Sequence, residues 1–364
     1  MIKEYVLKNI PDMHKYKIEK IVRESDPIVS SPSNILDIYD MEKYRVSSLN
    51  GDVDLKAILD NNIFTHIVGL INGSKSPNTR LSDEAKIACA IMCFLIYSGI
   101  EANPLFAISE VPDDPKFKSK KTQDYYFRIA DHVHPKIFAG LALGRLTHIP
   151  KKYLISSKYH VDTNKETQDN IRNTSFEKEN SEVFKVLFIN ILKAWILYKT
   201  EKNQLKRLEL ILKWNLENSL SEDTSMIFMI IFLSDRRMGK MIKNVNSSNP
   251  DNIIKQVSNA CWDLSYLFAL KSLHDKSGSR EVWFFITRDK VLKEISRFIY
   301  ALKDRCSAIE FIEKYYENEG VLLFLEYMEK VNKRENREEH KDKIRLKIDS
   351  SIVELKNQVF EVLG

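Results

Sequence analysis

The feature that most constrains the fold is one strongly strand-forming run in a chain whose other long segments have helical patterns. Every residue after the first in Glu281–Thr287 is aromatic or β-branched, and such residues favour strands. Elsewhere, long stretches rich in Lys, Glu, Leu and Ile predict helices, and only 10 Gly and 10 Pro occur in the whole chain. This composition argues against a many-turned all-β protein. We therefore expect an α/β protein in which helices predominate.

Length and charge leave several classes of function open. The 364 residues suffice for one large domain or two ordinary ones. Hydrophobic residues make up 43% and charged residues 29%, which is typical of globular chains and excludes wholesale disorder. The net charge of +5 permits binding to nucleic acid without requiring it.

The chain shows no export or membrane signal. Its N-terminus lacks the apolar segment of a signal peptide, and the apolar run Ile87–Ile100 is too short to cross a bilayer. The cysteines form no CxxC pair, so a disulfide framework or a zinc knuckle is not expected. They are Cys89, Cys93, Cys261 and Cys306. Reduced thiols suit the cytoplasm, and we expect a soluble cytoplasmic protein without a membrane partner.

Local signals place several further elements. The apolar run Asn34–Asp40 follows turn-type residues and predicts a buried strand. A helix is expected from about Ser82, a plausible N-cap, to a stop at Gly99. A second helix is expected over about 251–273, whereas the apolar run Met226–Leu233 fits either a buried helix or a strand.

Four separated acids are the most informative candidates for a site. Asp37 falls within or at the end of the first predicted strand, and Asp289 follows the second. Glu84 and Asp263 each precede apolar residues at helical spacing, which predicts that both lie on buried helix stripes. Buried acids are costly unless they are paired or bind a cation, and strand-end acids gather at the carboxyl edge of a parallel sheet.

Such a cluster predicts a divalent metal site. Carboxylate oxygens are the ligands that Mg²⁺ or Mn²⁺ prefers, and the bound ion can activate water against a phosphodiester. Asp40 is a further acid close to Asp37, and Thr287 is placed to bind a metal-bound water or to orient Asp289. The competing interpretation is structural, because each acid could equally cap a helix, end a turn or pair with a buried arginine.

The order strand–Asp, helix–Glu, helix–Asp, strand–Thr-x-Asp–helix resembles the PIN-like nuclease superfamily. The pieces that carry the resemblance are Ile35–Asp37, Asp83–Ala88, Trp262–Leu267 and Phe284–Leu292. The resemblance implies a parallel sheet flanked by helices, with Mg²⁺ or Mn²⁺ held by Asp37, Glu84, Asp263 and Asp289. It further implies hydrolysis of nucleic acid, RNA rather than DNA, and a toxin or phage-defence role.

The spacing departs from a compact PIN-like pattern. Glu84 and Asp263 are so far apart that a large, mainly helical insertion is required, and Glu101 or Glu209 could take the place of Glu84. We expect an N-terminal extension (1–30), a PIN-like core (31–100 plus 251–305), a helical insertion (101–250) and a helical tail (306–364). The insertion would select the substrate or a protein partner.

Two rival classes remain open. One is a non-catalytic helical interaction or assembly protein. The other is a metal-independent HEPN-type ribonuclease, because Arg128 and His134 fit its R-x(4–6)-H pattern, although Arg334 and His340 fit it equally well. His132 and His134 could bind zinc, but no matching cysteine or histidine cluster appears in the sequence.

Two basic stretches are candidates for phosphate contacts, against the more ordinary interpretation that they are solvated loops and helix ends. Their residues are Lys118, Lys120, Lys121, Arg236, Arg237 and Lys240. The sequence contains no GxxxxGK[ST], GxGxxG or GxSxG motif, so nucleoside-triphosphate, Rossmann and α/β-hydrolase sites have no support.

Overall fold

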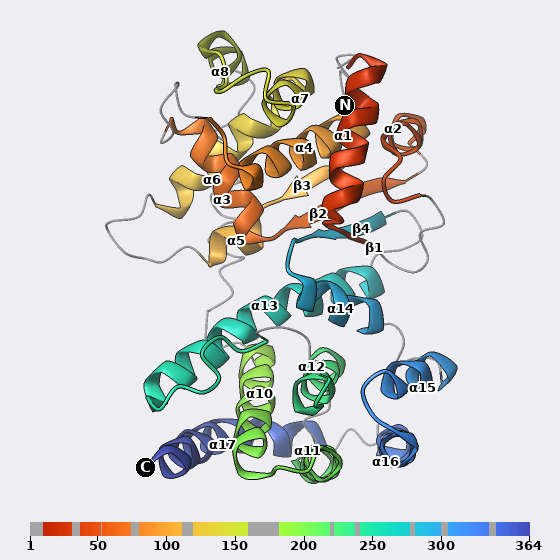
Figure 1. Ribbon diagram of the computed structural model, residues 1–364, viewed down its shortest axis with the longest axis vertical. Coiled ribbons are helices and arrows are strands. Elements are labelled where there is room, and N and C mark those ends of the chain that lie inside the picture. Colours follow the sequence, from red (N-terminus) through yellow and green to blue (C-terminus); the bar gives the residue numbers. More distant parts are fainter. Residues whose placement is uncertain are drawn as a thin grey trace. The chain divides into compact units, whose positions relative to one another are not determined.

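A computed structural model describes most of the chain and divides it into two compact units (Figure 1). The first unit comprises Met1–Phe176 and Leu270–Arg288, and the second comprises Glu177–Ala269 and Asp289–Gly364. The described residues are 10–30, 37–51, 53–73, 80–110, 119–158, 182–218, 222–236, 241–276, 281–299, 305–334 and 340–364. No helix within these ranges has both the length and the apolar character needed to cross a membrane.

The first unit is built on a four-stranded mixed sheet with the order β1-β4-β2-β3. Its strands are β1 (Ile28–Ser30), β2 (Asp54–Leu59), β3 (Glu101–Asn103) and β4 (Glu281–Ile286). Strands β2, β3 and β4 run parallel, whereas β1 pairs antiparallel with β4. The predicted strand at β4 is confirmed, but the sheet is mixed rather than wholly parallel because of β1.

Helices of the first unit bury one face of this sheet. Leu55, Ala57 and Leu59 of β2 join Phe284 and Ile286 of β4 in a single apolar core. The sheet and α4 and α7 can be followed in Figure 1, where both helices lie on the same side of it. The helices are α1 (Asp12–Ser25), α2 (Met41–Asn50), α3 (Asn61–Ile71), α4 (Asp83–Ser98), α5 (Leu105–Ser109), α6 (Lys120–Asp131), α7 (Pro135–Ala142) and α8 (Lys151–Lys158).

The predicted central helix is confirmed as α4. Ser82 Oγ accepts a hydrogen bond from the Ala85 N–H at 3.3 Å, and Gly99 ends the helix with a φ of 71°. Glycine adopts this left-handed conformation without steric cost, which explains the stop. The helix packs against α1, α2, α3 and α7, and it is therefore buried on nearly all sides after its first turn.

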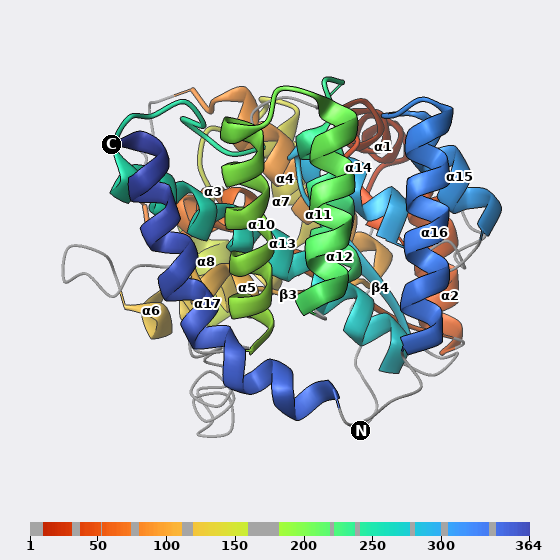
Figure 2. The same cartoon turned by 90° about the horizontal axis from the view of Figure 1, so that it is seen from below.

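Every regular secondary-structure element described in the second unit is a helix. The apolar run Met226–Leu233 forms a helix that packs against α10, α11 and α14, so every one of its residues is buried. Figure 2 shows α10, α11, α12, α16 and α17. The elements are α10 (Glu182–Thr200), α11 (Gln204–Asn218), α12 (Asp223–Leu233), α13 (Pro250–Lys276, whose residues from Leu270 belong to the first unit), α14 (Lys290–Ile299), α15 (Arg305–Glu313), α16 (Asn318–Arg334) and α17 (His340–Leu363).

Several expected boundaries differ from those observed. The segment 37–40 is not a strand: a turn at Ile38–Tyr39 leads to Asp40, whose side chain caps α2 by accepting from the Lys43 N–H at 2.9 Å. Residues 34–36 of that expected strand lie outside the described ranges. The expected extension 1–30 contributes α1 and β1, and the expected insertion 101–250 begins with β3, so both supply parts of the first unit.

Candidate functional site

Two neighbouring parallel strands end side by side in the first unit, and each is followed by a polar residue. Asp60 follows β2 and Thr287 follows β4, and both are buried, with 7% and 0% of their surfaces exposed. The Thr287 hydroxyl donates to Asp60 Oδ2 at 2.8 Å. The Asp60 N–H donates to the Ile286 carbonyl at 3.0 Å, which continues the ladder between the strands. A carboxylate is thereby held at the edge of the sheet.

This edge is where the strand order reverses. From β2 the chain passes to β3 on one side and later returns to β4 on the other side of β2. In open α/β sheets, the crevice at the carboxyl ends of the strands is the usual ligand site at such a reversal. The Asp60–Thr287 pair therefore occupies the position in this sheet where a site is expected on topology alone.

The third parallel strand adds further oxygen atoms to the same edge. Asn103 ends β3, pairs with Ile58 of β2 and accepts the Leu105 N–H on Oδ1 at 3.0 Å. Helix α5 starts two residues later and packs against β2 and α3. Glu110 ends α5 and is half-buried. Because a helix rises about 1.5 Å per residue, Glu110 lies about 8 Å along α5 from the edge.

Asp60 also begins the helix that follows β2. Its Oδ1 accepts the Asn62 N–H at 3.3 Å, which makes it the N-cap of α3. The two carboxylate oxygens thus have different partners, one on α3 and one after β4. Hydrogen bonds from two donors on different elements fix the orientation of this carboxylate.

Asp37, the first of the four sequence-predicted acids, does not end a strand. It lies just before α2, half exposed, and pairs with Arg23 at 2.8 Å. The Arg23 guanidinium, with the Tyr39 N–H, lowers the pKa of the Asp37 carboxyl below its ordinary value. This environment is that of a surface ion pair.

Glu84 and Asp263 were expected on buried stripes, and both expectations are wrong. Glu84 is exposed in the first turn of α4, whose burial starts at Ala85 and continues through Ala88. Asp263 is exposed on α13, whose buried stripe passes through Val257, Leu264 and Leu267. Both helices are buried over most of their circumference. The spacing of apolar residues therefore does not reveal which face of the helix carries the acid.

Asp289 caps a helix, which is the structural alternative to a metal-binding role that the sequence also allowed. Its Oδ1 accepts the N–H groups of Val291 and Leu292 at 2.7 and 3.1 Å, which caps α14. The Thr287 hydroxyl bonds to Asp60, whereas the sequence suggested that Thr287 would orient Asp289. Across the described residues, no group of three or more His, Cys, Asp or Glu side chains is arranged to hold a metal ion.

The two substitutes for Glu84 lie elsewhere. Glu101 starts β3 and is exposed at the amino end of the strand, opposite to the edge with Asp60. Glu209 lies on α11 of the second unit and pairs with Lys206 at 2.7 Å.

The HEPN-type pair has structural partners. Arg128 donates to the buried Asp124 carboxylate at 2.7 Å within α6, and His134 Nδ1 accepts the Lys136 N–H at the start of α7. His132 Nδ1 bonds to the Arg128 carbonyl at 2.9 Å. These contacts explain all three residues as parts of helix ends. In the alternative pair, Arg334 is the last residue of α16 and His340 is the first residue of α17.

The four cysteines differ in their exposure. Cys89, Cys93 and Cys261 are buried and Cys306 is exposed, and burial raises the pKa of the Cys93 and Cys261 thiols.

The two basic stretches are only partly described. Lys120 and Lys121 form the first turn of α6, and Arg236 donates to the Lys314 carbonyl at 3.4 Å. Lys118, Arg237 and Lys240 lie outside the described residues.

Sequence reasoning missed Asp60, although its signal was of the type applied to Asp37. The run Asp54–Leu59 is mainly apolar and ends directly before an acid and two asparagines. A strand assignment there would have marked Asp60 as a strand-end carboxylate. Comparisons of the chain with protein families, with curated proteins and with solved structures find no match.

Proposed function

We propose that the chain is a metal-dependent nuclease of the PIN-like type whose site lies at the carboxyl edge of β2 and β4. The observation that carries the proposal is the buried Asp60–Thr287 hydrogen bond where the strand order reverses. In this proposal Asp60 takes the place that the sequence pattern assigned to Asp37. Asp289 begins the second unit and caps α14, and it is not part of this site.

The donor atoms at this edge fit Mg²⁺ or Mn²⁺. Asp60, Asn103 and Thr287 supply carboxylate, amide and hydroxyl oxygens, which are hard ligands. Mg²⁺ is commonly held by one or two protein carboxylates, with water and substrate phosphates completing its shell. When bound, the ion supplies an activated water and neutralises charge on the phosphate.

The protein's own residues then have separate roles. Thr287 holds the Asp60 carboxylate in one orientation, and the α3 N–H group holds its other oxygen. Helix α6, which starts with Lys120 and Lys121, packs against α3 and α5, the helices that begin at this edge. We propose these lysines as contacts to a nucleic-acid backbone, because they lie on a helix that packs against the helices beginning at this edge. RNA as the preferred substrate, a cytoplasmic location and a toxin or phage-defence role belong to the same proposal.

Asp60→Asn tests the proposal directly. We expect it to reduce Mn²⁺-dependent cleavage of labelled single-stranded RNA and DNA by at least about 100-fold, because it removes the charge that holds the ion. Asp37→Asn and Glu84→Gln are matched controls that should leave cleavage unchanged.

Two results would contradict the proposal. One is wild-type chain that fails to cleave either nucleic acid with Mg²⁺ or Mn²⁺. The other is cleavage that survives in Asp60→Asn and is lost in Asp37→Asn, which would return the site to the original set of acids. Titration of Mn²⁺ binding to the wild type and to Asp60→Asn separates loss of the ion from loss of a later step.

A further inference from the structure

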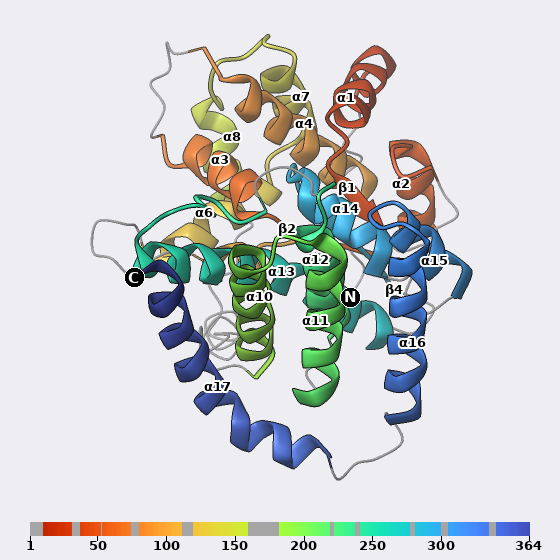
Figure 3. The ribbon, with the colours of Figure 1, turned by 60° about the horizontal axis from the view of Figure 1, so that its bottom comes forward.

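The second unit contains an open groove between α11 and α16, with a volume of about 680 Å³. These helices pack against one another, and Figures 2 and 3 show both. The groove is lined by leucines, glutamates and a few other polar residues. They are Glu201, Asn203, Leu205, Lys206, Glu209, Glu319, Leu322, Leu323 and Glu326.

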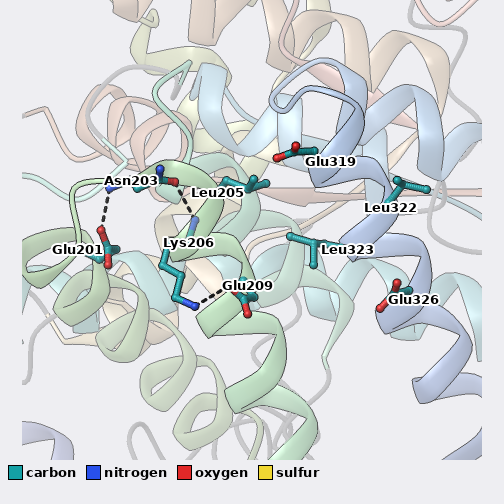
Figure 4. A pocket seen from close by; sticks show the side chains of 9 residues that line it. All are labelled: Glu201, Asn203, Leu205, Lys206, Glu209, Glu319, Leu322, Leu323 and Glu326. Atoms are coloured by element: carbon teal, nitrogen blue, oxygen red, sulfur yellow. Dashed lines mark hydrogen bonds and ion pairs between the residues drawn. The ribbon is translucent and has the colours of Figure 1, made fainter.

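The floor of the groove is apolar. Leu205 from α11 and Leu323 from α16 are half-buried and point toward one another (Figure 4). Leu322 is 62% exposed, which makes it one of the most exposed large apolar side chains of the described residues. Volumes of about 300–1,000 Å³ are typical of pockets that enclose ligand groups. The groove can therefore accept apolar side chains from another molecule.

The rim of the groove is acidic. Four glutamates and one lysine line it, and the lysine, Lys206, is already paired with Glu209 at 2.7 Å. Glu319 lies at one end of the leucine floor, and Glu209 and Glu326 lie toward the other (Figure 4). Glu326 approaches Lys330 at 3.9 Å, but both side chains are well exposed, so the pair is weak. The groove therefore carries a surplus of negative charge.

We propose that this groove binds a basic amphipathic helix of a partner protein. Its apolar residues would contact Leu205, Leu322 and Leu323, and its lysines or arginines would pair with the glutamates. Glu319 and Glu326 are seven residues apart on α16, which is about two helical turns or 10 Å. A partner helix with basic residues at i and i+7 and apolar residues between them matches this spacing.

The charge of the groove decides against two other occupants. Nucleic acid and anionic membranes both carry negative charge, and the four glutamates would repel them. The binding proposed here does not depend on the nuclease site, because every lining residue belongs to the second unit.

Fluorescence polarisation with a designed peptide tests the groove on the full chain. The probe is a labelled helix with lysines at i and i+7 and leucines at i+3 and i+4 between them, and the controls are a scrambled peptide and one with Glu for each Lys. We expect the basic helix to bind more tightly than both controls, and higher salt to weaken it because the pairs are exposed.

Variants locate the binding. Leu322→Ser and the double change Glu319→Lys with Glu326→Lys should each raise the dissociation constant roughly tenfold or more. Val353→Ser is the matched apolar control, since Val353 is 60% exposed on α17, and Glu313→Lys with Glu361→Lys is the charge control. Glu319→Gln with Glu326→Gln tests the charge at constant shape and keeps the test available if the reversal disturbs folding.

Three results would overturn the proposal. The first is equal binding of the basic and the scrambled peptides. The second is binding by the groove variants that is as tight as that of the wild type. Alternatively, sedimentation would show a dimer that Leu322→Ser dissociates while the peptide fails to bind, which would assign the groove to a second copy of the chain. Asp60→Asn should retain peptide binding, so failure of the groove and failure of the nuclease proposal are distinguishable.

Discussion

The two units place their buried polar side chains in different parts of their structures. In the first unit, Asp60 and Thr287 meet where two strands end. In the second, buried polar groups from four helices meet inside the helical core: Asn190 Nδ2 donates to Ser225 Oγ at 2.8 Å, and Asn215 lies between Asn190 and Tyr327. The Asn215 amide donates to Asn190 at 3.4 Å and accepts from the Tyr327 hydroxyl at 2.8 Å.

This difference separates a candidate site from a structural network. The amide and hydroxyl groups of the second unit bond to one another across α10, α11, α12 and α16, so they specify how these helices align. The first unit instead presents a carboxylate at a sheet edge, and acid chemistry at such an edge is typical of ligand sites. Stability should therefore respond most to changes in the network, and activity to changes at the edge.

The largest expected effect on stability comes from Asn190→Leu. It removes the central amide of the network and leaves Ser225 and Asn215 without that partner in a buried place. We expect a loss of about 2 kcal/mol in the free energy of unfolding, because two buried hydrogen bonds are lost and each contributes about 1 kcal/mol. Urea unfolding followed by circular dichroism measures it. A loss below about 1 kcal/mol would show that the network is not a structural core.

Thr287→Val tests the other side of the comparison. The change keeps the shape of the side chain and removes the hydrogen bond to Asp60. We expect cleavage to fall about 10–100-fold, as is usual when the group that orients a metal ligand is lost. Thr287→Ser should restore most of the rate because it keeps the hydroxyl. Equal rates for all three proteins would remove Thr287 from the site.

A smaller effect is expected from Tyr327→Phe. The ring stays and the hydroxyl that donates to Asn215 Oδ1 is lost. The expected loss in the free energy of unfolding is about 1 kcal/mol. Cleavage should not change, and a change in cleavage without loss of stability would contradict the separation of the two units' roles.

The smallest effect is expected from Asp37→Asn. Arg23 lowers the pKa of Asp37, so the ion pair stabilises the fold above the ordinary carboxyl pKa and loses this contribution as the pH falls through the lowered value. Because both side chains are substantially exposed, the change at neutral pH should be hardly measurable. Thermal melting of wild type and variant from pH 7 to pH 2 should converge at low pH. A wild-type advantage that grows on acidification would contradict the assignment.

Local patterns were sufficient for several elements. The aromatic and β-branched run at β4, the Ser82 and Gly99 caps of α4, and the long helix α13 were all predictable, because each depends on residues close together in the chain. The faces of Glu84 and Asp263 were not, since the neighbouring helices decide which side of a helix is covered. The helical state of Met226–Leu233 was likewise set by its surroundings. The run is apolar at every position, so it has no periodicity that distinguishes a helix from a strand.

By itself, the sequence determined the ends of α4, the strand character of β4 and the presence of acids beside predicted elements. Only the tertiary structure decided which acid stands at the edge of the sheet. Asp60 and Thr287 are 227 residues apart, and their hydrogen bond exists because β2 and β4 pair in a register that aligns Leu59 with Ile286. Strand pairing joins backbone groups from distant segments, so no local pattern specifies which strand end lies beside which.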